Sequence, residues 1–267
     1  MKHLLLLLLC LSCASYQGLS QFKVQKNQFY AGNQEERQSA DFYVPQGTGP
    51  FPGVILVHGG GWSSRHKGDM DSIAESLATH GFVVMNINYR FAPKFQHPTP
   101  IDDLAMALKY FKHEAQRLKL EPSKIGLWGY SSGAHTVSFY ALSRAGVPSE
   151  KVQAVVAGGG PYDFTWYHHS PIIGPYMGGF FNEKREAYFE ASPAWIVTPQ
   201  APPFFLYHGK QDKLLEYVQQ TSFKARLMRA GVFVKSHKVG WWGHAMTFAW
   251  PNRPVEKGVK FLQEQLR

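Results

Sequence analysis

Hydrophobic and polar positions along the chain follow two alternating patterns. Continuous apolar runs such as Gly53–Val57 (GVILV) are typical of strands buried on both faces of a sheet. Between these runs, apolar residues recur at helical spacing, as Leu104, Leu108 and Phe111 do. We expect strands at Gln38–Val44, Gly53–Val57, Phe82–Asn88, Ile125–Trp128, Val152–Ala157, Phe204–Tyr207 and Val232–Val239, and helices at Asp69–His80, Ile101–Leu118, Ser132–Arg144, Leu214–Ala230 and Val255–Leu266. This alternation predicts an α/β fold with a mostly parallel central sheet flanked by helices.

Residues 161–200 depart from this rhythm. The stretch is rich in aromatic residues, shows little periodicity, and is too long for an ordinary connection between two strands. We expect a short cap-like insertion that lines a pocket. No Pro- or Gly-rich linker divides the chain, so residues 15–267 are interpreted as one domain.

Composition narrows the class of protein. Of the 267 residues, 44% are hydrophobic and 18% charged, which argues against a disordered chain, and no repeats indicate a solenoid. The net charge is 28 − 19 = +9, but Lys and Arg are scattered and no run exceeds two, so a nucleic-acid partner is not expected. The sequence has no closely spaced cluster of His, Asp and Glu residues of the kind that binds a metal, so neither a metal nor a cofactor is expected.

The first 14 residues have the anatomy of a signal peptide. A basic start precedes an apolar run, and the small residues Ser12 and Ala14 occupy the −3 and −1 positions of a cleavage site. The run is shorter than the ~20 residues that span a membrane. Both cysteines lie here, and Leu11–Cys13 weakly resembles a bacterial lipoprotein box. We expect a secreted or periplasmic protein, with a lipid anchor at Cys13 as the alternative to release.

The segment Gly129–Gly133 (GYSSG) is the candidate nucleophile site. It matches G-x-S-x-G, and it lies between a predicted strand and a predicted helix, as this motif requires. The tight turn would strain the backbone at Ser131, and the flanking glycines avoid clashes there. The N–H of Ser132 would then lie at a helix N-terminus, where negative charge is favoured.

A glycine-rich segment, His58–Trp62 (HGGGW), directly follows the strand GVILV. Its uncovered backbone N–H groups suit an oxyanion hole, in which each donor is typically worth about 3 kcal/mol of the barrier. A phosphate-binding loop is not expected, because no G-K-[ST] follows.

The expected acid and base follow later strands. Asp212 lies in the loop after Phe204–Tyr207, and His244 in the loop after Val232–Val239. The order Ser131, Asp212, His244 is the chain order of the α/β-hydrolase triad. Asp163, after an earlier strand, stays open as a second choice for the acid.

Other acidic and histidine residues have simpler interpretations. Asp102 and Asp103 open a helix, which favours capping. The remaining histidines are expected to support the glycine loop (His58), to pack (His135), to be structural (His208), to face solvent (His113, His237), or to lie on the surface or touch substrate (His168, His169).

Taken together, these motifs resemble a known group of enzymes. The chain is similar to α/β-hydrolases of the esterase/lipase class that carry an HGGG motif, over about residues 54–248. Within the class it is most similar to the subgroup that includes feruloyl and acetyl-xylan esterases, with kynurenine-formamidase-like hydrolases as neighbours. The resemblance rests on HGGGW (58–62), NYRFAP (88–93), P-x-x-D (100–103), GYSSG (129–133), HG-x-x-D (208–212) and GH (243–244).

This resemblance implies roles for further residues. Gly60 and Gly61 would supply oxyanion donors together with Ser132, and Asp103 would be a structural helix residue. One departure is Ser132-Gly133-Ala134, where the family more often has Ala-Gly-Gly.

These observations predict a serine hydrolase that cleaves carboxylic esters, with small or aromatic/sugar-linked substrates. Amidases, formamidases and exopeptidases use the same triad and stay open as alternatives. A non-catalytic secreted binding protein is the alternative from another class. Five aromatic residues are candidates for the substrate pocket, with ordinary core packing as the competing interpretation: Trp62, Trp166, Tyr167, Phe180 and Phe181.

Overall fold

The computed structural model describes residues 21–249 and 252–266. The predicted signal peptide, together with Cys10 and Cys13, lies outside the described residues. No helix within the described ranges is long and apolar enough to cross a bilayer.

An eight-stranded sheet forms the centre of the molecule, in the order β1-β2-β4-β3-β5-β6-β7-β8. Its strands are β1 Phe22–Phe29, β2 Ser39–Pro45, β3 Phe51–Val57, β4 Val83–Ile87, β5 Leu120–Tyr130, β6 Ala154–Gly158, β7 Phe204–Gly209 and β8 Val234–Val239. The pairs β1–β2 and β2–β4 are antiparallel, and every other pair is parallel. The predicted mostly parallel sheet is confirmed; β1 was not predicted, because its burial pattern follows no two-residue period.

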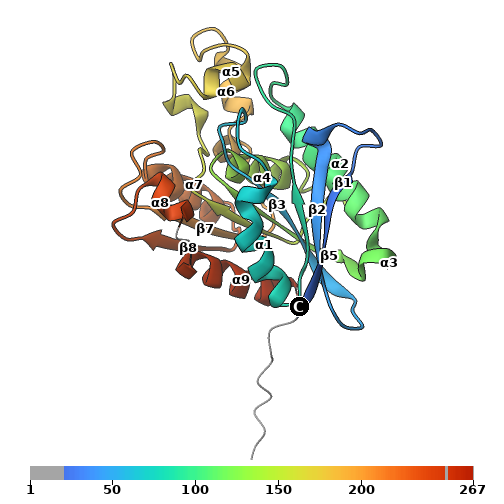
Figure 1. Ribbon diagram of the computed structural model, residues 1–267. Helices are drawn as coiled ribbons and strands as arrows, with labels where there is room; N and C mark the ends of the chain where they lie inside the picture. The colour runs from blue at the N-terminus through green and yellow to red at the C-terminus, as the bar shows by residue number, and fades with distance from the viewer. Residues whose placement is uncertain (1–20, 250–251, 267) are drawn as a thin grey trace, which may run out of the picture.

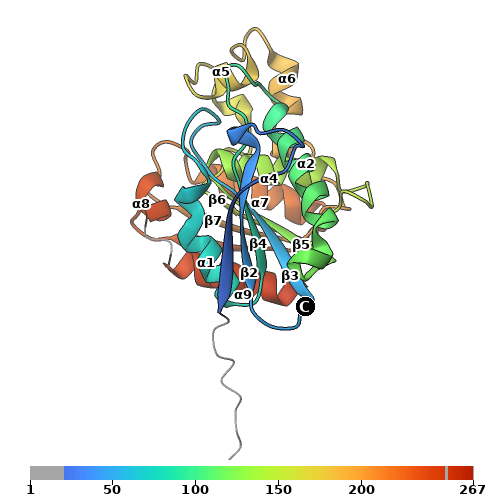
Figure 2. The ribbon, with the colours of Figure 1, turned by 45° about the vertical axis from the view of Figure 1, so that its right-hand side comes forward.

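Helices cover both faces of this sheet (Figures 1 and 2). The two faces are covered by α1 Asp71–Thr79 with α9 Asn252–Leu266, and by α2 Thr99–His113, α3 Ala115–Leu118, α4 Ser132–Ser143 and α7 Val218–Arg229. The predicted helix 101–118 is divided in the structure: α2 ends at His113, and α3 ends at Leu118, followed by Lys119, which is left-handed with φ 54°. The remaining short helices are α5 Ile173–Met177, α6 Arg185–Glu190, α8 His244–Ala249, η1 Glu36–Gln38, η2 Lys67–Met70, η3 Phe164–Trp166 and η4 Pro193–Trp195.

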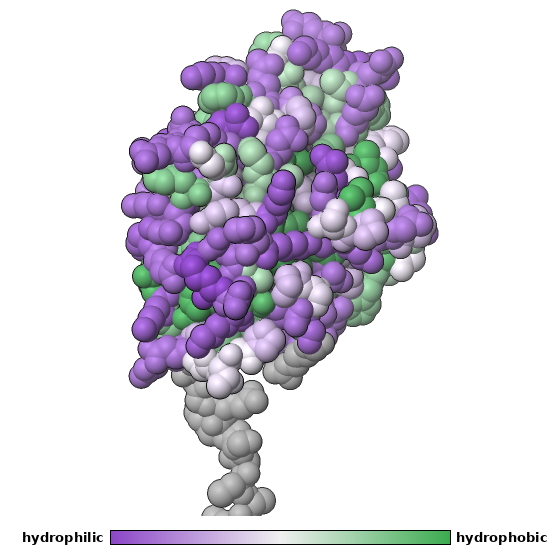
Figure 3. Space-filling view, turned by 90° about the vertical axis from the view of Figure 1, so that its right-hand side faces the viewer, coloured by the Kyte–Doolittle hydropathy of each residue, from purple (hydrophilic) through white to green (hydrophobic). Residues whose placement is uncertain are grey.

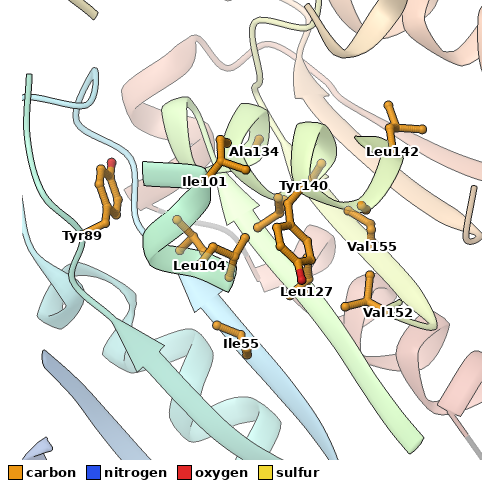
Figure 4. Packing of buried hydrophobic residues seen from close by; sticks show 14 of the residues in the cluster. Ile55, Tyr89, Ile101, Leu104, Leu127, Ala134, Tyr140, Leu142, Val152 and Val155 are labelled. Atoms are coloured by element: carbon orange, nitrogen blue, oxygen red, sulfur yellow. The ribbon is translucent and has the colours of Figure 1, made fainter. Parts of the chain in front are cut away.

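Two apolar layers, one on each face of the sheet, make the core. The larger joins α2 and α4 to the strands, and Figure 4 shows Ile101 and Leu104 of α2 among the side chains of this layer. Residues such as Ile55 and Leu127 are fully buried there, which explains the unbroken apolar runs in the sequence. This packing fixes the strand ends from which the candidate site is built.

Residues 161–200, called the insertion below, connect β6 to β7. They hold only short helices, and Figures 1 and 2 show α5 and α6 beyond the sheet at the top of the molecule. The insertion is fixed by aromatic packing: Tyr176 stacks on Trp62 with ring centroids 4.1 Å apart, and Phe164 stacks on His135 at 4.5 Å. Elsewhere, the face in Figure 3 is largely hydrophilic, with smaller apolar patches.

Candidate active site

Ser131 lies on a sharp turn between β5 and α4. Its backbone is left-handed in φ (56°, with ψ −122°), and its N–H donates to the carbonyl of Gly158 at 2.8 Å. A Cβ on Gly129 would lie 2.2 Å from the carbonyl oxygen of Gly133, and one on Gly133 would lie 2.1 Å from that of Val57. Neither contact is possible, so only glycine fits at positions 129 and 133, two residues before and two residues after this serine.

Ser131, His244 and Asp212 come together at the ends of three strands. The Nε2 atom of His244 lies 2.9 Å from Oγ of Ser131, and its Nδ1 lies 2.7 Å from Oδ2 of Asp212. A carboxylate accepts, so Nδ1 carries the proton and Nε2 is left to accept from the serine hydroxyl. This is the geometry of a nucleophile, a base and an orienting acid.

The Asp212 carboxylate is fully buried and strongly hydrogen-bonded. Its Oδ1 accepts from the N–H groups of Leu214 and Leu215 at 3.0 and 2.9 Å. The Nε2–H of His208, which is shared with the carbonyl of Leu215, lies 3.2 Å from its Oδ2. Burial alone would raise the pKa of Asp212, but the hydrogen bonds from His208 and His244 outweigh it and hold that pKa well below its usual value. Asp212 is therefore ionised at neutral pH.

His244 is the first residue of the short helix α8, and Tyr130 contacts it. The Tyr130 hydroxyl donates to the backbone carbonyl of His244 at 2.6 Å, and the two rings lie 5.2 Å apart. Thr247 ties the same helix to Gly243 through its N–H and its hydroxyl. The backbone that carries the imidazole is thus held by residues on two different elements, β5 and α8.

The glycine loop after β3 borders the same space. Gly60 and Gly61 have φ values of 113° and 61°, which few other residues adopt. The carbonyl of Gly60 accepts from the N–H groups of Ser63 and Ser64. Among the described residues, neither Gly60 nor Gly61 donates its own N–H to a backbone partner, so both donors remain available to a ligand.

Ser132 is the first residue of α4 and is buried at 2% exposure. Its hydroxyl lies 3.4 Å from that of Tyr89, whereas the hydroxyl within hydrogen-bond distance of His244 is that of Ser131. Tyr89 also donates to the carbonyl of His58 and stacks on the His58 ring at 4.5 Å. Burial lowers the pKa of His58 to about 4, and its neutral ring supports the glycine loop, as the sequence predicts.

A cavity of about 410 Å³ surrounds Ser131. The residues that line it come from five segments of the chain: Gly59–Arg65 and Asp69, Tyr130–Ser132, Pro161 with Tyr167, Ser170, Ile172 and Ile173, Leu214 with Leu215, and His244 with Ala245 and Phe248. All three predicted oxyanion residues border this one space, as do Ser131 and His244 of the predicted triad. Asp212 does not line it and is buried against Nδ1 of His244.

The predicted pocket aromatics divide into two groups. Trp62 and Tyr167 line the cavity. Trp166, Phe180 and Phe181 do not, which corrects the expectation for these three. Trp166 and Phe180 point to the surface at 52% and 40% exposure, and Phe181 packs on His168 with ring centroids 4.2 Å apart.

The competing acids have other partners. Asp103 is buried and accepts from the side chains of Arg90 and Gln38, as a structural helix residue would. Asp163 accepts from Thr165 and caps the N-terminus of the helix η3. Neither has a recorded contact with His244.

The other predicted histidines are packed or exposed. The buried Nε2 of His135 donates to the carbonyl of Ala191, and that of His208 to the carbonyl of Leu215. His113, His168 and His169 are exposed, and His237 is half-buried. Across residues 21–249 and 252–266, no group of three or more His, Cys, Asp or Glu side chains is arranged to hold a metal ion.

Several residues of the site were missed by the sequence analysis. They are Tyr130, the N–H donors of Leu214 and Leu215, and the charged residues Arg65 and Asp69 at the cavity. Tyr130 lies inside the G-x-S-x-G motif, so its position was a usable signal. The others are placed by loop conformation and carry no motif.

The chain has recognisable relatives. The family described as BD-FAE matches residues 40–227. A probable carboxylic ester hydrolase, LipM of Mycobacterium tuberculosis, is 30% identical over 196 residues, which are 67% of this chain and 46% of LipM. A probable isoprenylcysteine alpha-carbonyl methylesterase, ICMEL1 of Arabidopsis thaliana, is 24% identical over 87% of this chain and 53% of its own length. The chain thus spans about half the length of these curated relatives.

Solved structures share the fold. A truncated form of a carbohydrate esterase from gut microbiota superposes with a TM-score of 0.80 at 23% identity, covering 94% of this chain and 98% of that one. A bacterial heroin esterase superposes with a TM-score of 0.77 at 22% identity, covering 96% and 87%. At these identities the likeness establishes the α/β-hydrolase fold.

Proposed function

The chain belongs to the BD-FAE family, and from this premise we propose that it is a serine hydrolase that cleaves carboxylic esters through an acyl-enzyme. The observation that carries the proposal is the continuous hydrogen-bonded chain from Ser131 through His244 to an ionised Asp212. Relatives and solved structures named as esterases support the reaction class.

The first half of the proposed reaction transfers the acyl group to Ser131. Nε2 of His244 takes the hydroxyl proton as Oγ attacks the ester carbonyl carbon. The N–H groups of Gly60, Gly61 and Ser132 stabilise the oxyanion that forms. The bond from carbon to the leaving oxygen then breaks, and His244 returns the proton to the departing alcohol.

The second half releases the acid. Water loses a proton to His244 and attacks the acyl carbonyl, and the proton returns to Oγ of Ser131 as the acid departs. The Asp212 carboxylate keeps Nδ1 of His244 protonated and stabilises the imidazolium at each step. Every group in this cycle ends in its starting protonation state.

The cavity supports a modest substrate. A volume of about 410 Å³ accommodates a short acyl chain or a single ring together with part of a sugar. We therefore propose small, aromatic or sugar-linked esters as the substrate class. The fold shared with a protein described as a carbohydrate esterase is consistent with this choice.

The direct test is hydrolysis of 4-nitrophenyl esters from acetate to octanoate, with methyl ferulate added, by wild type beside Ser131→Ala. We expect turnover of short-chain or feruloyl esters that disappears in the variant. If the protein hydrolyses none of these esters and instead hydrolyses formamide or peptide substrates, the ester proposal is wrong and the amidase alternative replaces it.

We also propose export of the chain, on the sequence pattern of residues 1–14. The test is to fractionate cells that express the full chain and to determine the N-terminus by mass spectrometry. Cleavage before Ser15 supports release, and a lipid-modified Cys13 supports anchoring; recovery of the uncleaved chain inside the cell contradicts both.

A further inference from the structure

Arg65 borders the cavity but has no part in the proposed chemistry. Its aliphatic stem lies on the glycine loop, since a Cβ on Gly60 would come within 2.8 Å of Cγ of Arg65. The side chain is 59% exposed, so the guanidinium stays accessible to a ligand. A permanent positive charge is thus attached to the loop that carries the proposed oxyanion donors.

The backbone at Arg65 is strained. Its φ is 74°, and only five described residues other than glycine have positive φ. Three of these five, Trp62, Arg65 and Ser131, line the same cavity. A left-handed conformation costs roughly 1–3 kcal/mol at such a residue, and this strain concentrates at functional sites.

Neighbouring contacts hold Arg65 in this conformation. Its carbonyl accepts from the Arg37 guanidinium at 3.0 Å. Two residues further along, the N–H of Lys67 donates to Oδ1 of Asn88 at 2.7 Å. The Lys67 side chain is buried and pairs with Asp41 at 3.2 Å. The loop is fixed before a ligand arrives, which lowers the entropic cost of binding.

The charge on Arg65 is only partly balanced. Its sole ionic partner among the described residues is Asp69, at the long N–O distance of 3.8 Å. The Oδ2 of Asp69 meanwhile accepts from the N–H of His66. No hydrogen bond from the Arg65 guanidinium to a described residue is recorded, and a guanidinium offers five N–H donors suited to a carboxylate.

The rest of the cavity provides a contrasting surface. Residues after β7 and β8 contribute apolar side chains, namely Leu214, Leu215, Ala245 and Phe248. Apart from His244, Arg65 and Asp69 are the only titratable charged residues among those that line it. The cavity therefore suits an ester that is apolar in one part and negatively charged in another.

We propose that Arg65 is a specificity-determining residue that binds a carboxylate carried by the ester substrate. The inference rests on the proposed esterase function and specifies its substrate class. The carboxylate belongs either to the acyl group, as in a monoester of a dicarboxylic acid, or to the leaving alcohol. Both arrangements present the same planar anion to the guanidinium.

The test compares charged esters with their neutral methyl esters. For the acyl side the pair is mono-4-nitrophenyl succinate and 4-nitrophenyl methyl succinate. For the leaving-group side the pair is 4-acetoxybenzoate and methyl 4-acetoxybenzoate. The quantity measured is the ratio of kcat/KM for the charged ester to that for the neutral ester, in wild type, Arg65→Gln and Arg65→Lys.

We expect the ratio to fall about tenfold in Arg65→Gln on one of the two arms, through a higher KM. Arg65→Lys should retain part of the preference, because it keeps the charge and loses the bidentate geometry. The wild-type ratio should also fall as salt is raised, because ions screen the interaction at an exposed charge.

Arg229→Gln is the matched control. Arg229 is an exposed arginine at the end of α7 that does not line the cavity, so its removal changes the net charge equally. An unchanged ratio in Arg65→Gln on both arms would overturn the proposal, as would an equal fall in Arg229→Gln. Turnover of the neutral esters, lost in Ser131→Ala, reports on the esterase function separately.

Discussion

Two regions that face one cavity are built in different ways. Around Ser131, backbone geometry sets the site: glycines permit close contacts, and the acid and base follow directly after strands β7 and β8. In the insertion, side-chain packing sets the structure, through stacks such as Tyr176 on Trp62. The first region is specified by short motifs, whereas the second depends on residues far apart in the sequence.

This difference has a physical consequence for the substrate pocket. A motif fixes where a serine or a glycine N–H lies, because sheet register and tight turns leave few alternatives. An aromatic residue in an irregular segment can face the cavity, the core or water. In the insertion only Tyr167 among the four predicted aromatics faces the cavity.

The largest expected effect separates chemistry from folding. Ser131→Ala should lower kcat/KM by about 10⁴-fold or more, because the nucleophile is lost. The free energy of unfolding should change little, because the substitution removes only the hydroxyl group and leaves the rest of the turn in place. Ester hydrolysis and urea denaturation measure the two effects.

Ser143→Ala is the control for this variant, because Ser143 lies at the other end of α4 and is exposed. It should leave turnover within about twofold of wild type. Retained activity in Ser131→Ala would show that the turn after β5 does not supply the nucleophile.

The second largest expected effect is a loss of stability in the insertion. Tyr176→Ala removes a fully buried ring that stacks on Trp62, so the free energy of unfolding should fall by about 3–5 kcal/mol. Trp166→Ala, at a ring that is 52% exposed, should cost about 0.5 kcal/mol or less. Equal losses in the two variants would mean that the stacking does not fix the insertion.

Acid should loosen the insertion before it affects the triad carboxylate. His97 bonds to the Tyr176 hydroxyl at 3.0 Å, and burial lowers the pKa of His97 to about 4. Below its unfolded pKa of about 6.5 the unfolded chain binds more protons, so stability is lost as pH falls from 6.5 to 4, by up to about 3 kcal/mol.

Asp212 loses its contribution in the same direction, but in a lower pH window. Its folded pKa is lowered from 3.8, so its contribution is present above that pH and is lost only at lower pH. Urea denaturation of wild type and His97→Gln between pH 7 and pH 4.5 tests the first window. His97→Gln should show a shallower decline; an identical slope in both proteins would exclude His97 as a source.

The smallest expected effect compares two neighbouring residues. Tyr167→Ala should lower kcat/KM about fivefold by removing part of the cavity wall, a cost of about 1 kcal/mol. Trp166→Ala should stay within about twofold of wild type, because its ring points away from the cavity. A larger effect at Trp166 than at Tyr167 would mean that substrate extends onto the outer face of the insertion.

Sequence patterns were most informative where burial is complete. The run Gly53–Val57 in β3 is apolar throughout, and β4 is apolar except for the buried Asn86. Ser131, Asp212 and His244 each follow a strand, so the fold and the meeting of these three residues were predictable. The edge strand β1 was missed because half-exposed residues show no clear period.

The surroundings of the site were less predictable. The N–H groups of Leu214 and Leu215 reach Asp212 only through the conformation of their loop. Arg65 borders the cavity because its backbone is left-handed, which no sequence period indicates. Such contacts depend on tertiary packing, so a single sequence carries little signal for them.

The most direct test of the account is covalent labelling. The chain is treated with diethyl 4-nitrophenyl phosphate, which phosphorylates an activated serine, and the modified peptide is mapped by mass spectrometry. We predict one adduct, on Ser131, that abolishes ester hydrolysis and does not form in His244→Ala. Labelling of Ser132 or another residue, or ester hydrolysis that continues after Ser131 is fully labelled, would contradict the assignment of Ser131 as the nucleophile.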